Sequence, residues 1–468
     1  MKLKYYSMGV VLSAVMLTTF SSCQLTNKYK SPEVDMENLY RGKHTSDTTS
    51  IASIPWQEYF KDANLRALIG EGLENNYDLK IAVTRIQQAE VGLSIARAAY
   101  FPNVALVGSL DHKRYSSQNG KTNLLGYHTD DQYGLGVAVT WELDIWGKMN
   151  RQSKAKYAQF LSSHAYRNLI QTSLISNIAT SYYALLALDK QLQVTNATIE
   201  LLQESTTSME SMQEAAFLNA AAVEQSKALL YGTKVSVPAL ESQIRELENT
   251  ISLMLGRNPG SIVRSSIDDQ EIPAELKQGV PAQLLSNRPD VLQAELNFRS
   301  AFELKQAAQA SLYPTISLNS GTMVGFVATG SNFFKPENIF ASIMAGITQP
   351  IFARKQLTGQ LKITKLQQQE ALFNFEKTVL SAGKEVSDIL YNYESSLKKN
   401  ESREKQIESL SKSVEYTQAL LSGDEANYLE VLTAEQNYLQ AQLGQISDKL
   451  EQLQAAVSLY RALGGGAE

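Results

Sequence analysis

The chain has 468 residues, a formal net charge of −5, 43% hydrophobic residues and only 11 prolines. The hydrophobic content excludes a disordered chain, and the acidic balance argues against a nucleic-acid-binding protein. The four histidines are scattered and HExxH, CxxC and P-loop motifs are absent from the sequence, so we expect no enzyme, no cofactor and no metal site.

The N-terminus has the pattern of an export signal. Lys2 and Lys4 precede a short apolar run, Met8–Phe20, which is followed by small residues. This pattern predicts a signal peptide over 1–22. Cys23 is the only cysteine, so an internal disulfide is excluded. The letters FSSC that end at Cys23 resemble a bacterial lipobox and predict lipid acylation there, while the alternative is a stray thiol beside an ordinary cleavage site.

The two halves of the chain resemble each other. Ala99–Ser109 is similar to Ser311–Gly321, and the offset between matching segments stays between 206 and 212 residues. Such internal symmetry indicates a duplication. We therefore divide the mature chain into a first repeat, 23–255, and a second repeat, 256–468.

Each repeat is expected to contain a helix, two strands separated by a polar loop, and two long helices joined by a turn. In the first repeat the strands are expected at about Asn103–Leu110 and Gly134–Ile145. The latter alternates between apolar and small or polar residues, which predicts two faces in different environments. In the second repeat the strands are expected at about Thr315–Val327 and Phe340–Ile351, where the alternation is weaker.

The helical parts are unusually long. Lys148–Tyr231 contains no glycine and no proline, and its apolar residues mostly recur at steps of three or four. If Lys148–Asn219 is one helix, it is about 108 Å long, at about 1.5 Å per residue. Leu439–Tyr460 carries a heptad seam of apolar residues. Helices of this length predict a rod or a tube.

After the export signal, no stretch reads as a transmembrane helix, so a membrane span would have to be made of strands. The alternating strand suits lipid on one face and water on the other, and a soluble sheet packed on one face is the alternative. Four strands cannot close a barrel, whereas twelve strands from three chains would enclose water. The expected fold class is mostly α with a β-barrel part: duplicated long helical hairpins and four transmembrane strands per chain, in a trimeric α/β barrel.

Four segments together carry a family resemblance. They are Pro55–Ala82, Thr140–Lys148, Leu284–Glu295 and Asn427–Gly466, and they occur in the family's order. The chain resembles the TolC/OprM family of outer-membrane efflux ducts, in its lipoprotein branch.

This resemblance implies the passive exit duct of a tripartite efflux system, which is not an enzyme. It implies a homotrimer in the outer membrane, lipid-anchored at Cys23 and extending into the periplasm, where it meets an adaptor and an inner-membrane pump of the RND type. The helix turns at about Phe217–Ala222 and Ser422–Asn427 would form the periplasmic tip. The alternative that stays open is a periplasmic coiled-coil adaptor or structural lipoprotein without a pore.

The resemblance also implies a gate on the helix that follows the second turn. In the segment NYLEVLTAEQ, Leu429 matches an apolar constriction position of the family and Glu430 matches a carboxylate position. Thr433 stands where an Asp is usual, and Gln436 stands where OprM-like members have Arg, so the usual ion pair is missing. We expect Leu429 to set the narrowest radius and Glu430 to favour cations.

Overall fold

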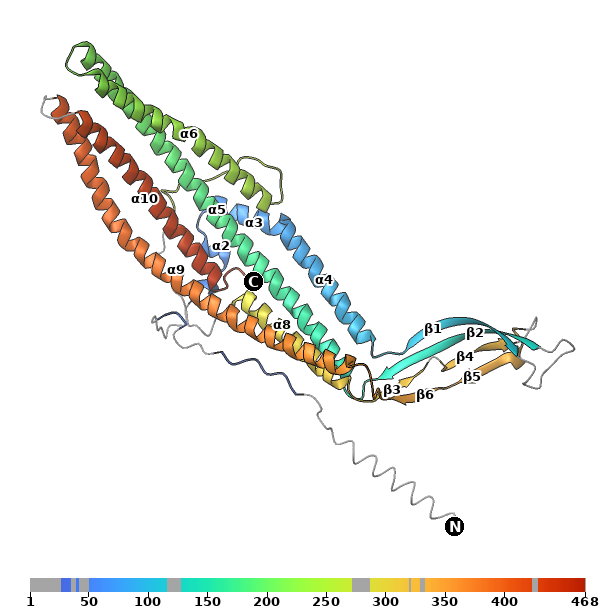
Figure 1. Ribbon diagram of the computed structural model, residues 1–468. Coiled ribbons are helices and arrows are strands. Elements are labelled where there is room, and N and C mark those ends of the chain that lie inside the picture. Colours follow the sequence, from blue (N-terminus) through green and yellow to red (C-terminus); the bar gives the residue numbers. More distant parts are fainter. Residues whose placement is uncertain are drawn as a thin grey trace. The chain divides into compact units, whose positions relative to one another are not determined.

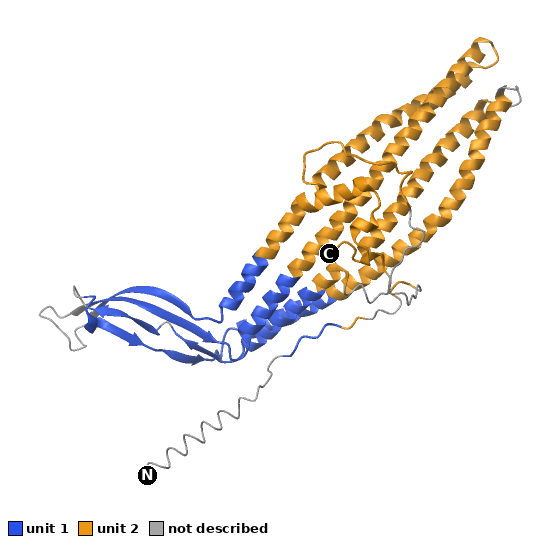
Figure 2. Ribbon diagram, turned by 180° about the vertical axis from the view of Figure 1, so that it is seen from behind, with its two compact units in different colours: residues 1–32, 88–161, 295–373 blue, residues 33–87, 162–294, 374–468 orange. Residues whose placement is uncertain are grey.

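The structure is a computed structural model that describes residues 27–34, 39–41, 50–115, 128–271, 287–319, 321–328, 333–422 and 428–467. The predicted signal peptide and Cys23 lie outside these residues. The chain divides into two compact units, each made of segments from both halves of the sequence (Figure 2). Unit 1 comprises 1–32, 88–161 and 295–373, and unit 2 comprises 33–87, 162–294 and 374–468.

The duplication predicted from the sequence is confirmed by two long helical hairpins of equal size (Figure 1). Helix α5 (Lys148–Glu214) and helix α9 (Gln356–Ser422) have 67 residues each. The returning helices α6 (Ala220–Met254) and α10 (Tyr428–Ala462) have 35 residues each. At about 1.5 Å per residue, α5 and α9 each span about 100 Å. No helix among the described residues is both long and apolar enough to cross a membrane.

The first long helix is shorter than the predicted helix over Lys148–Asn219. Helix α5 ends at Glu214, and Ala216 follows with a φ of 60°, in the left-handed region that ends helices. Asn219 belongs to the start of the next helix. The Asn219 side chain accepts a hydrogen bond of 3.0 Å from the backbone N–H of Ala222 and so caps α6. In the second hairpin, α9 ends at Ser422 and α10 begins at Tyr428, on either side of the predicted turn.

A shorter helix precedes the strands of each half, α4 (Tyr77–Ala98) in the first and α8 (Pro289–Ala310) in the second, and both have 22 residues. The residue before each one caps the end of a returning helix. The side chain of Asn76 donates a hydrogen bond of 2.9 Å to the carbonyl of Met254, the last residue of α6. At the equivalent joint, Arg288 donates one of 2.6 Å to the carbonyl of Ala462, the last residue of α10.

A glycine completes each of these joints. Gly256 after α6 and Gly464 after α10 have φ angles of 68° and 93°, in the left-handed region that favours glycine. Gly256 lies against the carbonyl oxygen of Asn75, and Gly464 lies against that of Asn287. A Cβ atom at either glycine would collide with that oxygen. The repeat boundaries 23–255 and 256–468 are compatible with these joints and remain a prediction.

The core of unit 2 contains two large buried clusters. One surrounds α3 (Ala63–Asn75), which follows the short helices η1 (Ile51–Ser53) and α2 (Trp56–Tyr59). The other lies between α8, α9 and α10. Among the members of these two clusters are Leu65, Ile69, Ile178, Tyr182, Leu255, Val291, Phe375, Val379, Val386 and Leu459.

Unit 1 contains one antiparallel sheet, in which β1 (Asn103–Tyr115) and β2 (His128–Leu143) form a long hairpin. Each strand predicted in the second repeat is present in two pieces. The first is divided into β3 (Thr315–Leu318) and β4 (Met323–Ala328), and the second into β5 (Ile339–Ser342) and β6 (Ala345–Thr348), with the 3-10 helix η3 (Pro336–Asn338) before β5. Strands β3 and β4 both pair with β2, and their outer partners are β6 and β5.

The break between β3 and β4 is a bulge. On β2, Ala138 pairs with Met323 and Trp141 pairs with Leu318, so three steps along β2 match five steps along its neighbour. The two extra residues lie between the two pairing regions, one more than in a common bulge. Because the number of extra residues is even, the alternation of side chains keeps its phase through the break.

The hydroxyl group of Thr322 replaces backbone groups at this bulge. It accepts a hydrogen bond of 2.8 Å from the N–H of Met344 and donates one of 3.0 Å to the carbonyl of the same residue. The backbone carbonyl of Thr322 accepts a hydrogen bond of 2.8 Å from the N–H of Val139. The ladder therefore continues through a side chain where the backbone has left its regular path.

The pairing register gives the sheet two chemically different faces, because directly opposed residues share a face. On one face, Val137 lies between Leu106 and Val324, and this face is apolar from Val104 to Leu110 of β1, beyond which it carries the pair of His112 and Asp131. On the other face, Ala138 lies between Ala105 and Met323, and small residues dominate. The apolar face carries Val104, Leu106, Leu110, Leu135, Val137, Val139, Trp141, Leu143, Ile316, Leu318, Val324, Phe326, Ile339 and Ile347.

Candidate functional site

The four predicted gate residues lie in the first turns of α10 and share one exposed side of it. Leu429 is 51% exposed, and Glu430, Thr433 and Gln436 are exposed as well. The Thr433 hydroxyl donates a hydrogen bond of 2.7 Å to the carbonyl of Leu429, so it is satisfied within the helix. We call these four residues the gate stripe. The structure brings them together on one helix face, and their role remains a prediction.

The opposite side of α10 packs onto the first hairpin. Leu432 is buried in a small cluster with Met209 of α5 and Val223 of α6. Tyr428 and Leu218 pack against the same cluster. This apolar contact holds the second hairpin against the first near the turns of both hairpins.

Sequence reasoning passed over a fifth residue, Glu435, on that packed side. It is only 9% exposed, and its Oε1 atom accepts a hydrogen bond of 3.1 Å from the side chain of Gln418 on α9. Its Oε2 atom is buried without a hydrogen-bond partner. Burial raises the pKa of this carboxyl group, opposed by the Gln418 hydrogen bond. The available signal was its position three residues after Leu432, which places both on one helix face.

The equivalent positions of the first hairpin carry different side chains. At an offset of 208 residues, Gln418 and Glu435 correspond to Glu210 and Lys227. Lys227 forms a salt bridge of 2.9 Å with Glu210, and both side chains are partly exposed. The first hairpin thus joins its helices through an ordinary acid–base pair, whereas the second buries an acid against an amide.

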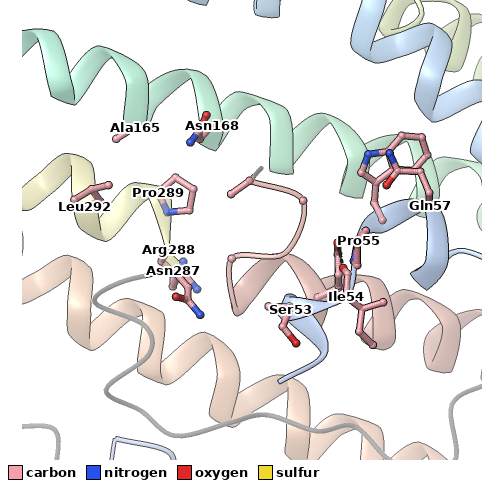
Figure 3. Close-up of a pocket in the computed structure, with 16 residues that line it drawn as sticks. Ser53, Ile54, Pro55, Gln57, Ala165, Asn168, Asn287, Arg288, Pro289 and Leu292 are labelled. Atoms are coloured by element: carbon pink, nitrogen blue, oxygen red, sulfur yellow. Dashed lines mark hydrogen bonds between the residues drawn. The ribbon is translucent and has the colours of Figure 1, made fainter. Parts of the chain in front are cut away.

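A cavity of about 680 Å³ lies in unit 2 beside the Arg288 joint (Figure 3). Figure 3 shows Ser53, Ile54 and Pro55 grouped in one part of the lining, with Asn287 and Arg288 in another. Arg288 is the one charged residue among those that line it. Its guanidinium group is already bound to carboxylates, at 2.7 Å from Asp290 and 2.8 Å from Glu385. Glu385 also pairs with Arg461. We therefore assign the cavity to the structural joint.

Possible metal ligands do not cluster in the described part of the chain. Among those residues, no group of three or more histidine, cysteine, aspartate or glutamate side chains could hold a metal ion. His112 and Asp131 form a pair on the hairpin of β1 and β2, and both side chains are at least half exposed. This exposed pair belongs to the surface of the sheet.

The residues that follow the predicted lipid site are tied to unit 1. The carbonyl of Asn27 accepts a hydrogen bond of 3.0 Å from the guanidinium of Arg151, one turn after α5 begins. The Ser31 hydroxyl donates one of 2.7 Å to Glu295, and the ring of Tyr29 packs edge-on against Phe302 at 5.6 Å between centroids. Asn27, four residues after Cys23, is thus held at Arg151, which lies eight residues after the end of β2.

Duplicated helical hairpins of this length, combined with a sheet that has one apolar face, define a class of envelope channel proteins. The model of the family described as "Outer membrane efflux protein" matches residues 68–257 and 280–465. The chain belongs to this outer membrane efflux protein family, which confirms the resemblance found in the sequence.

Two relatives of known name agree with this assignment. The chain is 26% identical over 462 residues to the probable outer membrane lipoprotein SilC of Salmonella typhimurium, covering 97% of this chain and 98% of the relative. It is 26% identical over 455 residues to the cation efflux system protein CusC of Escherichia coli K12, covering 95% and 97%.

Solved structures give the same fold. The outer-membrane channel OprN matches with a TM-score of 0.86 and 25% identity, over 95% of this chain and all of that chain. A structure of CusC matches with a TM-score of 0.82 and 25% identity, over 94% and 99%. The open MtrE channel of Neisseria gonorrhoeae shares the fold with a TM-score of 0.83 at 22% identity, over 95% and 99%.

Proposed function

We propose that this chain forms, as a homotrimer, the outer-membrane exit duct of a tripartite efflux system. It is a passive conduit: a partner pump supplies the energy and a periplasmic adaptor joins the two. The observation that carries the proposal is the two-faced sheet with open edges. The alternative adaptor without a pore would need neither the apolar sheet face nor those edges.

The open edges call for strands from other copies. Among the described strands, β1 pairs only with β2, and β5 and β6 pair only with β4 and β3. The apolar face is exposed in the single chain, with Leu106 at 75% and Val137 at 43%. An apolar face suits lipid, but unpaired backbone groups do not. Pairing β1 of one copy with β5 and β6 of the next resolves this, and three copies would close a water-filled barrel.

The duplication also shows which helices should meet between copies. Within the chain, α8 packs on the start of α5: Arg151 contacts Glu303 at 2.8 Å, and Gln159 donates a hydrogen bond of 3.2 Å to Ser300. Glu303 and Ser300 are almost fully buried. In the first half, the helix equivalent to α8 is α4, and the same face of α4 is exposed.

This exposed face of α4 has an apolar partner surface on α9. At an offset of 212, Glu303 corresponds to Val91, which is 59% exposed. On the other side, α9 exposes Ile363 and Leu366, where α5 buries Ala155 and Ala158 at an offset of 208. We infer that α4 of one copy packs on α9 of the next, as α8 packs on α5 within the chain.

This interface can be tested with a matched pair of variants. Leu366→Glu places a charge on the inferred interface, whereas Lys365→Glu places it one residue away, at the position equivalent to the partly exposed Tyr157. We expect Leu366→Glu to reduce the trimer fraction of the protein purified in mild detergent, measured by light scattering, and Lys365→Glu to preserve it. Equal trimer fractions in both variants would contradict the inferred packing.

The lipid anchor is part of the proposal. The strap from Asn27 to Ser31 holds the chain beside the start of α5, and four residues span at most about 14 Å. A lipid on Cys23 would therefore stay near the junction of β2 and α5, where the membrane-facing sheet begins. The gate stripe belongs to the proposal as well: three-fold symmetry would bring three copies of Leu429 and Glu430 to one axis.

A further inference from the structure

Glu435 is a buried acid that the gate stripe does not use. Its neighbour on the same helix face, Leu432, packs against Met209 and Val223. One turn further from the hairpin turns, α5 and α6 carry Thr206 and Ser226, which are buried and hydrogen-bonded to each other at 2.7 Å. The helices therefore place a polar, uncharged layer behind the apolar contact, at the level of Glu435.

Charged groups on the surrounding helices do not compensate this acid. On α5 and α6, Glu210 and Lys227 form a salt bridge with each other. On α9, Glu415 is exposed, and on α10 itself Glu430 lies on the exposed gate stripe. Burial accordingly dominates the environment of Glu435, with the Gln418 hydrogen bond as the opposing contribution.

The sign of the pH effect follows from burial. A carboxyl group whose pKa is raised in the packed state destabilises that state when it ionises. The packing of α10 is therefore fully favoured at pH values below the ordinary pKa of the group. It is weakened as the pH rises from that value through the raised pKa. A protonated Glu435 is neutral, so its burial no longer carries the cost of removing a charge from water.

We propose that Glu435 is a proton-binding site that couples the packing of the second hairpin on the first to pH. Protonation holds α10 against α5 and α6, and ionisation favours a state in which the carboxylate reaches water. The gate stripe lies on the opposite side of the same helical turns of α10. Release of α10 would therefore move Leu429 and Glu430. This consequence at the gate rests on the proposed duct, whereas the proton-coupled packing does not.

Amide hydrogen exchange of residues 428–440 tests the coupling in the full-length protein in detergent. After correction for the intrinsic exchange rate, we expect severalfold stronger protection at about pH 5 than at about pH 8. Glu435→Gln should abolish this difference and keep the segment protected at both values. The control Glu430→Gln changes an exposed carboxylate on the same helix and should retain the wild-type difference.

A second variant keeps the test decisive if Glu435→Gln folds poorly. Gln418→Leu removes the hydrogen bond that favours the ionised form, so it should move the exchange midpoint to higher pH. A pH difference that persists in Glu435→Gln, or an unchanged midpoint in Gln418→Leu, would overturn the proposal. Because exchange is read without conductance, a protein that forms no channel would refute the duct and leave this result standing.

Discussion

At the scale of single residues, a charged substitution should have different effects on the two faces of the sheet. Leu106 and Ala105 are adjacent on β1 and are both exposed in the single chain, yet they lie on different faces. Leu106→Arg puts a charge on the apolar face and should destabilise the assembled protein by about 2–4 kcal/mol near the middle of the membrane. Ala105→Arg should cost clearly less, because the small-residue face would meet water. Unfolding in denaturant from lipid vesicles measures both, and equal losses would argue against lipid on the apolar face.

Single residues also show why parts of the structure escaped prediction. The predicted strand over Thr315–Val327 is interrupted at the bulge, where Thr322 bonds to Met344, a contact between residues 22 apart that no local pattern records. Glu435 reads as an ordinary exposed helix acid in the sequence. Its burial depends on packing against a hairpin that lies more than 200 residues earlier in the chain.

At the scale of elements, the long helices were predictable because their cause is local. An uninterrupted run without glycine or proline, with apolar residues at helical spacing, specifies a helix wherever it lies. The end of α5 was less predictable, since Ala216, which follows it in a left-handed conformation, is a residue type that favours helices. The equal lengths of matching helices follow from the duplication.

The gate stripe is the element-scale feature to test in a working channel. We expect Glu430→Gln to lower the permeability of cations relative to anions, because a ring of carboxylates favours cations. Leu429→Ala should raise the resting conductance by widening the constriction. Reversal potentials under a salt gradient measure the first effect, and the current without partner proteins measures the second. If neither quantity changes, the gate lies elsewhere.

At the scale of the whole molecule, one duplicated chain supplies every component that a duct requires. The sheet offers an apolar face and two open edges, and the hairpins offer helices of about 100 Å that pack together through Met209, Val223 and Leu432. Because the chain is duplicated, a contact within one copy indicates how two copies can meet. The packing of α8 on α5 is such a contact. Membership of the outer membrane efflux protein family is consistent with this combination of sheet and hairpins.

Ion conductance across a planar lipid bilayer tests the central claim most directly. The purified wild-type trimer should insert and produce discrete, ohmic current steps, small at rest and larger in Leu429→Ala. Leu366→Glu, which should reduce the trimer fraction, should produce fewer steps at the same protein concentration. A folded wild-type trimer that inserts into the bilayer and carries no current, in either the wild type or Leu429→Ala, would contradict the account.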